Sequence, residues 1–390
     1  MLDDLASTRE AFLLFGVLGF TYLFALDALL QPVDYWRLLF PAFNAEFEIS
    51  WVYNCATVTT LVALVVRAAT NSAAPIALAR RIVVGFCVLF LLLVALPASA
   101  FVLSTTTARL AMVLTSTAVI AVAIATIDST MFALASRFPV GAVEYIQLGI
   151  GCSLLVSALY RVASKALFAS DHVVEATMAY FGVAACTVAL GLVAFDRLHR
   201  LPLTQRCLQP SHNPTTPHDV AATWGKIWFH EAMVALCNAT TYVVYPGVVT
   251  SIRSHTAPAA RATSGWWPLV LMTSYAGADA LGRFCVRWRL GWTHRHLWIL
   301  VFPRLLLIPL LVAAARATTP WLAHNSIALA LVALLGLSNG YVGTLAIVVV
   351  NDIVEPHEQT ITGMCASLSV NVGLFVGATL GLALAHLLDL

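Results

Sequence analysis

The chain has 390 residues, of which 60% are hydrophobic and 10% are charged, with a formal net charge of +2. Soluble domains carry about 25% charged residues, so this composition excludes a water-soluble globular fold, and the small net charge excludes a nucleic-acid-binding surface. The 8 cysteines include no CxxC pair and fall largely in or beside apolar runs, as small buried side chains do. The sequence therefore predicts an all-α integral membrane protein.

A membrane-spanning helix needs about 20 mainly apolar residues. No cleavable signal peptide is evident, so we expect the first apolar run to be retained as a span. Lys and Arg are more frequent in the segments that lie inside when the amino terminus is cytoplasmic, which the positive-inside rule favours. An odd number of spans then makes the carboxy terminus extracellular. The predicted spans are eleven, at 11–31, 50–67, 81–101, 109–135, 141–161, 174–195, 227–250, 265–286, 296–315, 321–350 and 361–388.

One long polar stretch, 196–226, interrupts this pattern. Its prolines and polar residues predict an irregular cytoplasmic linker. It divides the chain into an amino-terminal domain of six spans, 1–195, and a carboxy-terminal domain of five spans, 227–390. Glu231, near the start of the seventh span, is expected to be exposed to solvent at the membrane interface.

Asp279 and Arg283 lie four residues apart within the span at 265–286. This spacing places both side chains on one helical face, one turn apart. Each charge costs about 2.5–3.5 kcal/mol at the centre of a spanning helix on insertion scales, so we expect both to face a protein interior or a wet cavity. Two interpretations stay open: the pair is a structural clamp, or it binds the hydroxyl groups of a sugar.

The second half of the chain resembles the equilibrative nucleoside transporter family. Five segments within 227–390 carry the resemblance, each on the expected span and in the expected order. They are the aromatic-x-x-x-Asp-x-x-Gly-Arg run at 275–283, the Arg304 to Pro309-Leu310 step, Ser338-Asn339-Gly340-Tyr341, an acidic loop leading to Gly363, and Tyr245-Pro246.

The amino-terminal half resembles the family more weakly. Residues 23–36 are similar to the family's Leu-Leu-Pro-Trp-Asn start, with Leu26 in place of Trp and Asp27 in place of Asn. Residues 127–135 lie where the family has a Gln, and here that position is Asp128. At Leu26 the chain departs from the aromatic residue with which, as the resemblance implies, the family contacts a base.

The resemblance implies a fold related to the major facilitator superfamily, in which two domains rock about a central site by alternating access. It implies transport of a nucleoside, with purines favoured, or of a nucleobase. Asp279 and Arg283 would hold the ribose, and Asp128, with Gln147, Tyr53 or Leu26 nearby, would meet the base. We expect facilitated diffusion without a cofactor or metal, a monomer, and the plasma membrane.

Asp27 and Asp128 are acids without an adjacent cation in the sequence. Three interpretations stay open: Asp128 accepts hydrogen bonds from a base, either acid couples transport to protons, or either is bonded to hydroxyl groups for structure. Arg304 is expected to be a structural cation that neutralises an acid on another span, Asp279 being one candidate, or to act directly in transport. Ser338 and Asn339 are expected to hold their span against its neighbours.

Several other functions lack their usual sequence marks. The chain has no GxxxxGK[ST] phosphate loop, which argues against an ATP-driven pump, and no GxSxG or HExxH motif, which argues against an enzyme. A multi-span receptor or scaffold is the remote alternative. Proton-coupled symport through Asp27 or Asp128 is the closer one.

Overall fold

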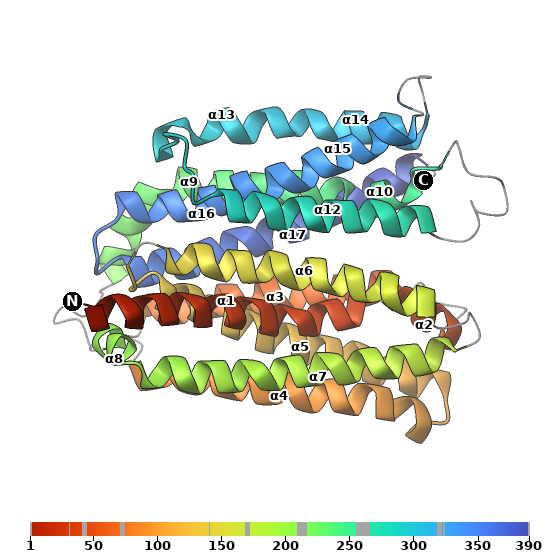
Figure 1. The fold of residues 1–390 in the computed structure, drawn as a ribbon, viewed down its shortest axis with the longest axis horizontal. Helices are drawn as coiled ribbons and strands as arrows, with labels where there is room; N and C mark the ends of the chain where they lie inside the picture. The colour runs from red at the N-terminus through yellow and green to blue at the C-terminus, as the bar shows by residue number, and fades with distance from the viewer. Residues whose placement is uncertain are drawn as a thin grey trace. The chain divides into compact units, whose positions relative to one another are not determined.

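The computed structural model describes residues 2–30, 32–40, 45–70, 75–139, 141–167, 172–208, 217–254, 266–317, 322 and 324–388. Every regular element within these ranges is a helix (Figure 1), which confirms the all-α prediction. The chain divides into two compact units, 1–223 with 355–368 and 224–354 with 369–390. We call these unit 1 and unit 2. The last helix, α17 (Gln359–Leu388), contributes its first residues to unit 1 and the rest to unit 2.

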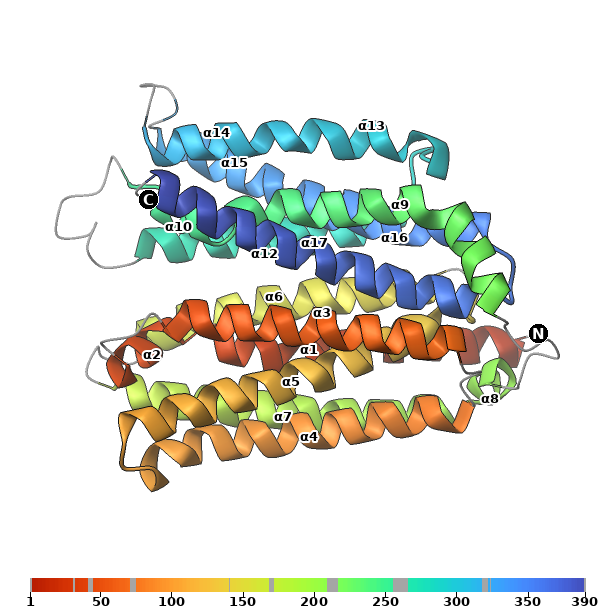
Figure 2. The same cartoon turned by 180° about the vertical axis from the view of Figure 1, so that it is seen from behind.

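Unit 1 is a bundle of long helices. In it α1 packs against α6 and α7, α3 against α5, and α4 against both α5 and α7. Figures 1 and 2 show α4 and α7 running side by side over their length. Its elements are α1 (Leu2–Leu30), α2 (Val33–Leu39), α3 (Ala45–Thr70), α4 (Pro75–Val102), α5 (Thr106–Ala135), α6 (Ala142–Leu167), α7 (Val173–Arg200) and α8 (Pro202–Leu208).

Unit 2 contains more broken helices. In it α12 packs against α15 and η3, while α14 packs against α10 and α15. Its elements are α9 (Pro217–Val244, which begins in unit 1), α10 (Gly247–Ser251), α12 (Trp266–Cys285), η1 (His294–His296), α13 (Leu297–Val301), η2 (Phe302–Leu306), α14 (Leu307–Ala315), α15 (Asn325–Ser338), η3 (Asn339–Gly343), α16 (Thr344–Val350) and η4 (Asn351–Ile353).

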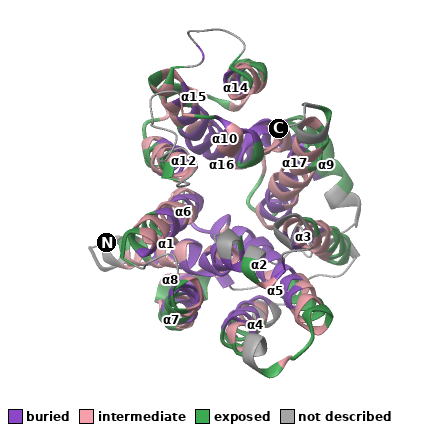
Figure 3. Cartoon of the chain, turned by 90° about the vertical axis from the view of Figure 1, so that its right-hand side faces the viewer, coloured by how far each residue is buried: buried purple, intermediate pink, exposed green. Residues whose placement is uncertain are grey.

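The helices bury one side and expose apolar side chains on the other. On α4, Val84, Leu91 and Val94 are 52%, 64% and 51% exposed, whereas Phe86 and Leu89 between them are fully buried. Figure 3 shows the same division of each bundle into buried and exposed faces. An exposed face made of large apolar residues suits lipid rather than water, so the burial pattern agrees with the membrane assignment from composition.

Ten helical stretches among the described residues are long and apolar enough to cross a membrane. They match the predicted spans except the one at 265–286, which corresponds to α12. This helix is 20 residues long, but Asp279 and Arg283 lower its mean hydropathy. A hydropathy criterion for spanning helices therefore misses α12 because of the same two charges that mark the candidate site.

The prediction of an irregular linker over 196–226 is wrong for most of the residues that the structure describes there. Residues 196–200 continue α7, α8 occupies Pro202–Leu208, and α9 begins at Pro217. Pro202 and Pro217 begin helices instead of breaking them, because proline lacks only the N–H that is unpaired in the first turn anyway. Residues 209–216 lie outside the described part of the chain. The predicted domain boundaries stay a prediction.

Candidate substrate site

The predicted charged pair lies on α12 and is buried. The guanidinium Nε of Arg283 donates to the Asp279 Oδ2 atom at 2.7 Å, with the Asp279 side chain fully buried and that of Arg283 13% exposed. Because the two residues are four apart on a helix, α12 alone sets this geometry. Both residues belong to unit 2.

A second element completes the coordination of Asp279. The Nδ2 atom of Asn339 donates to the other carboxylate oxygen of Asp279 at 2.7 Å. Asn339 begins η3, a π-helical turn between α15 and α16. Such turns are rare, and functional sites often contain them. The carboxylate thus has a cation on one oxygen and an amide on the other.

Arg304 is the centre of a neighbouring network. It lies on η2, is 4% exposed, and donates to the Cys237 carbonyl oxygen at 2.8 Å, the Thr241 hydroxyl at 2.6 Å and the Ser338 hydroxyl at 3.1 Å. The Thr241 hydroxyl donates in turn to the Asn339 Oδ1 atom at 2.9 Å. Arg304 is therefore satisfied largely by neutral acceptors.

The prediction that Arg304 could neutralise Asp279 directly is wrong. No ion pair joins them among the described residues; Asn339 lies between, bonded to Asp279 and within 3.4 Å of an Arg304 nitrogen. The predicted group of Asp279, Arg283, Arg304, Ser338 and Asn339 is nevertheless brought together by hydrogen bonds within unit 2.

Glycines set the distance between α12 and its neighbours. A Cβ atom on Gly340 would lie 2.0 Å from the Asp279 carbonyl oxygen, and one on Gly336 would lie 2.4 Å from that of Tyr275. Only glycine allows so close an approach of two helix backbones. This contact brings Asn339 within reach of Asp279. The close packing against α12 and the hydrogen bond from Asn339 to Asp279 therefore both depend on η3.

Two tyrosines lie near this network. The rings of Tyr245 and Tyr275 stack with centroids 4.0 Å apart and an interplanar angle of 22°. Tyr275 is one helical turn before Asp279 on the same face of α12. Both rings are buried, at 7% and 2% exposure. Tyr245 of the Tyr-Pro motif and Tyr275 of the 275–283 motif thus form one stacked pair.

The two acids of unit 1 have different surroundings. Asp27 on α1 accepts a hydrogen bond from the Ser153 hydroxyl on α6 at 2.9 Å. Asp128 on α5 accepts from the Tyr22 hydroxyl at 2.5 Å and from the Ser367 hydroxyl. Each acid is 8% exposed, and no cation pairs with either among the described residues. The structure thus gives both acids hydroxyl partners.

The remaining predicted residues of unit 1 lie on three helices. Leu26 on α1 is partly exposed, and Tyr53 on α3 and Gln147 on α6 are each 5% exposed. Asp27 accepts from the Ser153 hydroxyl, and Asp128 accepts from the hydroxyls of Tyr22 and Ser367. Contact of these residues with a base stays a prediction.

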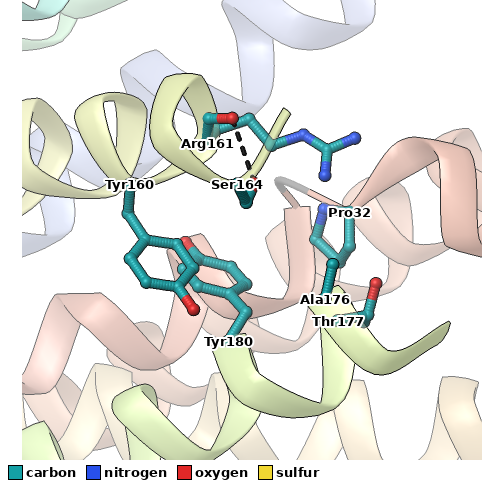
Figure 4. Close-up of a pocket in the computed structure, with 7 residues that line it drawn as sticks. All are labelled: Pro32, Tyr160, Arg161, Ser164, Ala176, Thr177 and Tyr180. Atoms are coloured by element: carbon teal, nitrogen blue, oxygen red, sulfur yellow. Dashed lines mark hydrogen bonds between the residues drawn. The ribbon is translucent and has the colours of Figure 1, made fainter. Parts of the chain in front are cut away.

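A small pocket opens elsewhere in unit 1. It encloses about 220 Å³ when space open to solvent is counted. The rings of Tyr160 and Tyr180 stack beside it at 4.9 Å, as Figure 4 shows. None of the predicted site residues lines it. Its lining consists of Pro32, Tyr160, Arg161, Ser164, Ala176, Thr177 and Tyr180.

The expectation that Glu231 is exposed is wrong, since the residue is 1% exposed. It lies 14 positions after Pro217, where α9 begins, which is about 21 Å along a helix rising 1.5 Å per residue. The early start of α9 therefore moves Glu231 deep into the bundle.

Sequence reasoning missed several hydrogen-bond partners. Cys237 and Thr241 are four residues apart on α9, a spacing that could have marked a shared face. Ser153 and Ser157 have the same spacing on α6. Tyr22 and Ser367 gave no signal, because their partner Asp128 is 106 and 239 positions away.

Known proteins resemble this chain over its whole length. A profile of the nucleoside transporter family matches residues 208–386. Equilibrative nucleotide transporter 8 of Arabidopsis thaliana is 23% identical over 382 residues, covering 96% of this chain and 94% of that protein. Nucleoside transporter 2 of Leishmania donovani is 30% identical over 149 residues, which is 37% of this chain and 28% of that one.

A solved structure supports the fold. The proton:xylose symporter of the major facilitator superfamily, solved with 6-bromo-6-deoxy-D-glucose, superposes with a TM-score of 0.66 at 11% identity, covering 98% of this chain and 89% of that one. The chain is an all-α integral membrane protein with a fold like that of the major facilitator superfamily.

Proposed function

We propose that the chain is a member of the equilibrative nucleoside transporter family, whose profile matches residues 208–386 and one of whose relatives aligns over 96% of the chain, and that it carries purine nucleosides across a membrane by alternating access. Transport is facilitated diffusion down the gradient of the substrate. Pyrimidine nucleosides and nucleobases are secondary cargo.

The observation that carries this proposal is the buried Asp279–Arg283 pair with Asn339. A ribose offers hydroxyl donors, which a carboxylate accepts, and lone pairs, which a guanidinium or amide N–H can reach. The Asp279 carboxylate is bonded on both oxygens, so its orientation is determined before a substrate arrives. Preorganisation of this kind lowers the entropic cost of binding.

The proposal includes the topology. We take α12 as an eleventh span beside the ten that composition selects, which gives six spans before residue 196 and five after residue 226. The amino terminus is then cytoplasmic and the carboxy terminus extracellular. The protein acts as a monomer in the plasma membrane and uses no cofactor.

Proton-coupled symport through Asp27 or Asp128 is the second candidate. The observation that favours it is that both buried acids are met by hydroxyl groups and by no cation among the described residues. Acids in such surroundings are often proton carriers in transporters.

Uptake into proteoliposomes tests the main proposal. We expect saturable uptake of labelled adenosine, with stronger competition from inosine than from uridine, hypoxanthine or adenine. Asp279→Asn is expected to abolish uptake while the purified protein keeps its helical content. The control is Asp196→Asn, which breaks a pair of the same spacing with Arg200 on an exposed face and is expected to transport normally.

Two outcomes would contradict the proposal. Uptake that never saturates indicates a pore, and the absence of uptake with bound nucleoside indicates a receptor. Normal transport by Asp279→Asn would remove the pair from the substrate site and leave it a structural clamp.

A further inference from the structure

Glu231 on α9 is a buried carboxylate without a well-formed hydrogen bond. Its side chain is 1% exposed, neither carboxylate oxygen completes a hydrogen bond among the described residues, and the Ser369 hydroxyl is the donor that lies near it. Asp27, Asp128 and Asp279 each accept at least one well-formed hydrogen bond. Glu231 is therefore held less firmly than these three acids, and a buried polar group in such surroundings needs an explanation.

The helix that faces Glu231 is α17, in its unit 2 part. Cβ atoms on Gly373, Gly377 and Gly381 would lie 2.3, 2.6 and 2.6 Å from carbonyl oxygens of Ala235, Ala239 and Val243, respectively. Each of these contacts joins residues that are 138 positions apart in the sequence, so α9 and α17 run parallel along this contact, which we call the seam. One turn earlier, the same spacing places Ser369 beside Glu231. Ser369 is itself only 8% exposed.

No ion pair joins Glu231 to a cation among the described residues, and the neighbouring cationic and titratable groups have other contacts. Arg304 on η2 is engaged by Cys237, Thr241 and Ser338. The His230 ring lies beside that of His294 on η1, with centroids 5.8 Å apart. Between Ser369 and Gly381, α17 has no titratable residue, and α16 has none.

An ionised carboxylate in this seam would be costly. Burial of an unpaired charge is so unfavourable that the group usually takes the neutral form. A Ca²⁺-like ion needs six to eight oxygen ligands, and no group of three or more acidic, His or Cys side chains exists among the described residues. A single proton needs only one oxygen.

We propose that Glu231 is a proton-binding site of the transport cycle. An O–H bond forms between a Glu231 carboxylate oxygen and a proton from water on the side to which the site is open. The neutral carboxyl is then buried between α9 and α17, as described here. When the seam hydrates on the opposite side, the O–H bond breaks, and the proton leaves to water there. This inference rests on the proposed transport of nucleosides. It replaces facilitated diffusion by proton-coupled transport and assigns the coupling to Glu231 instead of Asp27 or Asp128.

Proteoliposomes with an imposed pH gradient test the coupling. One pH unit is a tenfold difference in proton activity, so one proton per nucleoside supports up to about tenfold accumulation of adenosine in the wild type. Glu231→Gln mimics the protonated side chain, so it is expected to keep nucleoside exchange without a gradient but to lose accumulation.

Two controls locate the effect. Glu175→Gln changes an exposed glutamate on α7 and His230→Asn changes the neighbouring titratable group; both are expected to retain accumulation. Loss of accumulation in His230→Asn but not in Glu231→Gln would overturn the inference, as would wild-type accumulation driven by sodium. Saturable wild-type uptake that ignores the pH gradient would overturn it and leave the proposed function intact.

Infrared spectroscopy tests the site without transport. The purified wild-type protein is expected to show the C=O stretch of a buried protonated carboxyl at neutral pH, and Glu231→Gln is expected to lose this band. Persistence of the whole band in Glu231→Gln would assign it to another acid and overturn the inference. This measurement decides the question even if no nucleoside is transported and the proposed function fails.

Discussion

The polar centres of the two units are built differently. In unit 2 a buried acid has a cation one turn away and an amide from a neighbouring element, and a second arginine lies in an adjoining network. In unit 1 two buried acids are held by hydroxyl groups from serine and tyrosine. Both units thus contain buried carboxylates on predicted spans, and among the described residues the buried carboxylate with an ion pair is Asp279 of unit 2.

The difference has a thermodynamic consequence. A buried ion pair is costly to form but more costly to break, because removal of one partner leaves the other as an unpaired charge. A carboxyl held by hydroxyl groups can become neutral without leaving a charge behind. The same change of Asp to Asn should therefore have a large effect in unit 2 and a small one in unit 1.

The largest effect is expected for Asp279→Asn. It leaves the buried Arg283 without its counter-ion, and breaking a buried pair in this way costs about 3–5 kcal/mol. Thermal unfolding of the purified protein, followed by circular dichroism, measures the change. The matched Asp196→Asn variant breaks an exposed pair of the same spacing and is expected to cost less than about 0.5 kcal/mol. Equal effects would mean that Arg283 has another counter-ion.

Part of this arrangement could be predicted from the sequence. The Asp279–Arg283 pair is local, because a helix places positions four apart on one face, and the apolar runs predicted the spans. The partners of Arg304 could not be predicted, since Ser338 and Thr241 are 34 and 63 positions away. Helix periodicity determines which face of a helix a residue lies on, but not which residues of other helices contact that face.

Glu231 shows the same limit in a single residue. Its exposure depends on where α9 begins and on the register of α17 against it, which rests on contacts between residues such as Ala235 and Gly373. The sequence pattern assigns Pro217 to the linker, whereas in the structure this proline begins α9. The predicted start of the span, at 227, is therefore ten residues too late.

A smaller loss is expected for Arg304→Lys. Lysine keeps the charge but lacks the planar fork, so it cannot donate to Thr241, Ser338 and the Cys237 carbonyl together. Loss of one hydrogen bond to a charged group costs about 1.5–3 kcal/mol. The same thermal measurement applies. A neutral result would show that Arg304 contributes charge alone, and Arg304→Gln should then be the more damaging variant.

A comparable or smaller loss is expected for Gly340→Ala. Its Cβ atom would lie 2.0 Å from the Asp279 carbonyl oxygen, and overpacking of this kind typically costs about 1–3 kcal/mol. The control is Gly225→Ala on α9, where no atom lies within 4 Å of the added carbon and the better helix propensity of alanine stabilises by up to about 1 kcal/mol. The two changes should have opposite signs in the thermal measurement. Equal signs would contradict the close packing of α12 against η3.

The smallest effect is expected for Asp128→Asn in unit 1. The amide oxygen can still accept from Tyr22 or Ser367, and the hydrogen bond that is lost is worth about 0.5–1.5 kcal/mol. The change also removes a group that is costly to bury when charged, so the net shift should stay within about 1 kcal/mol. Asp128→Leu leaves both hydroxyl groups without their acceptor and should cost more, about 1–3 kcal/mol for each buried group. If Asp128→Asn were as damaging as Asp279→Asn, Asp128 would have to be ionised and paired, and the contrast between the two units would disappear.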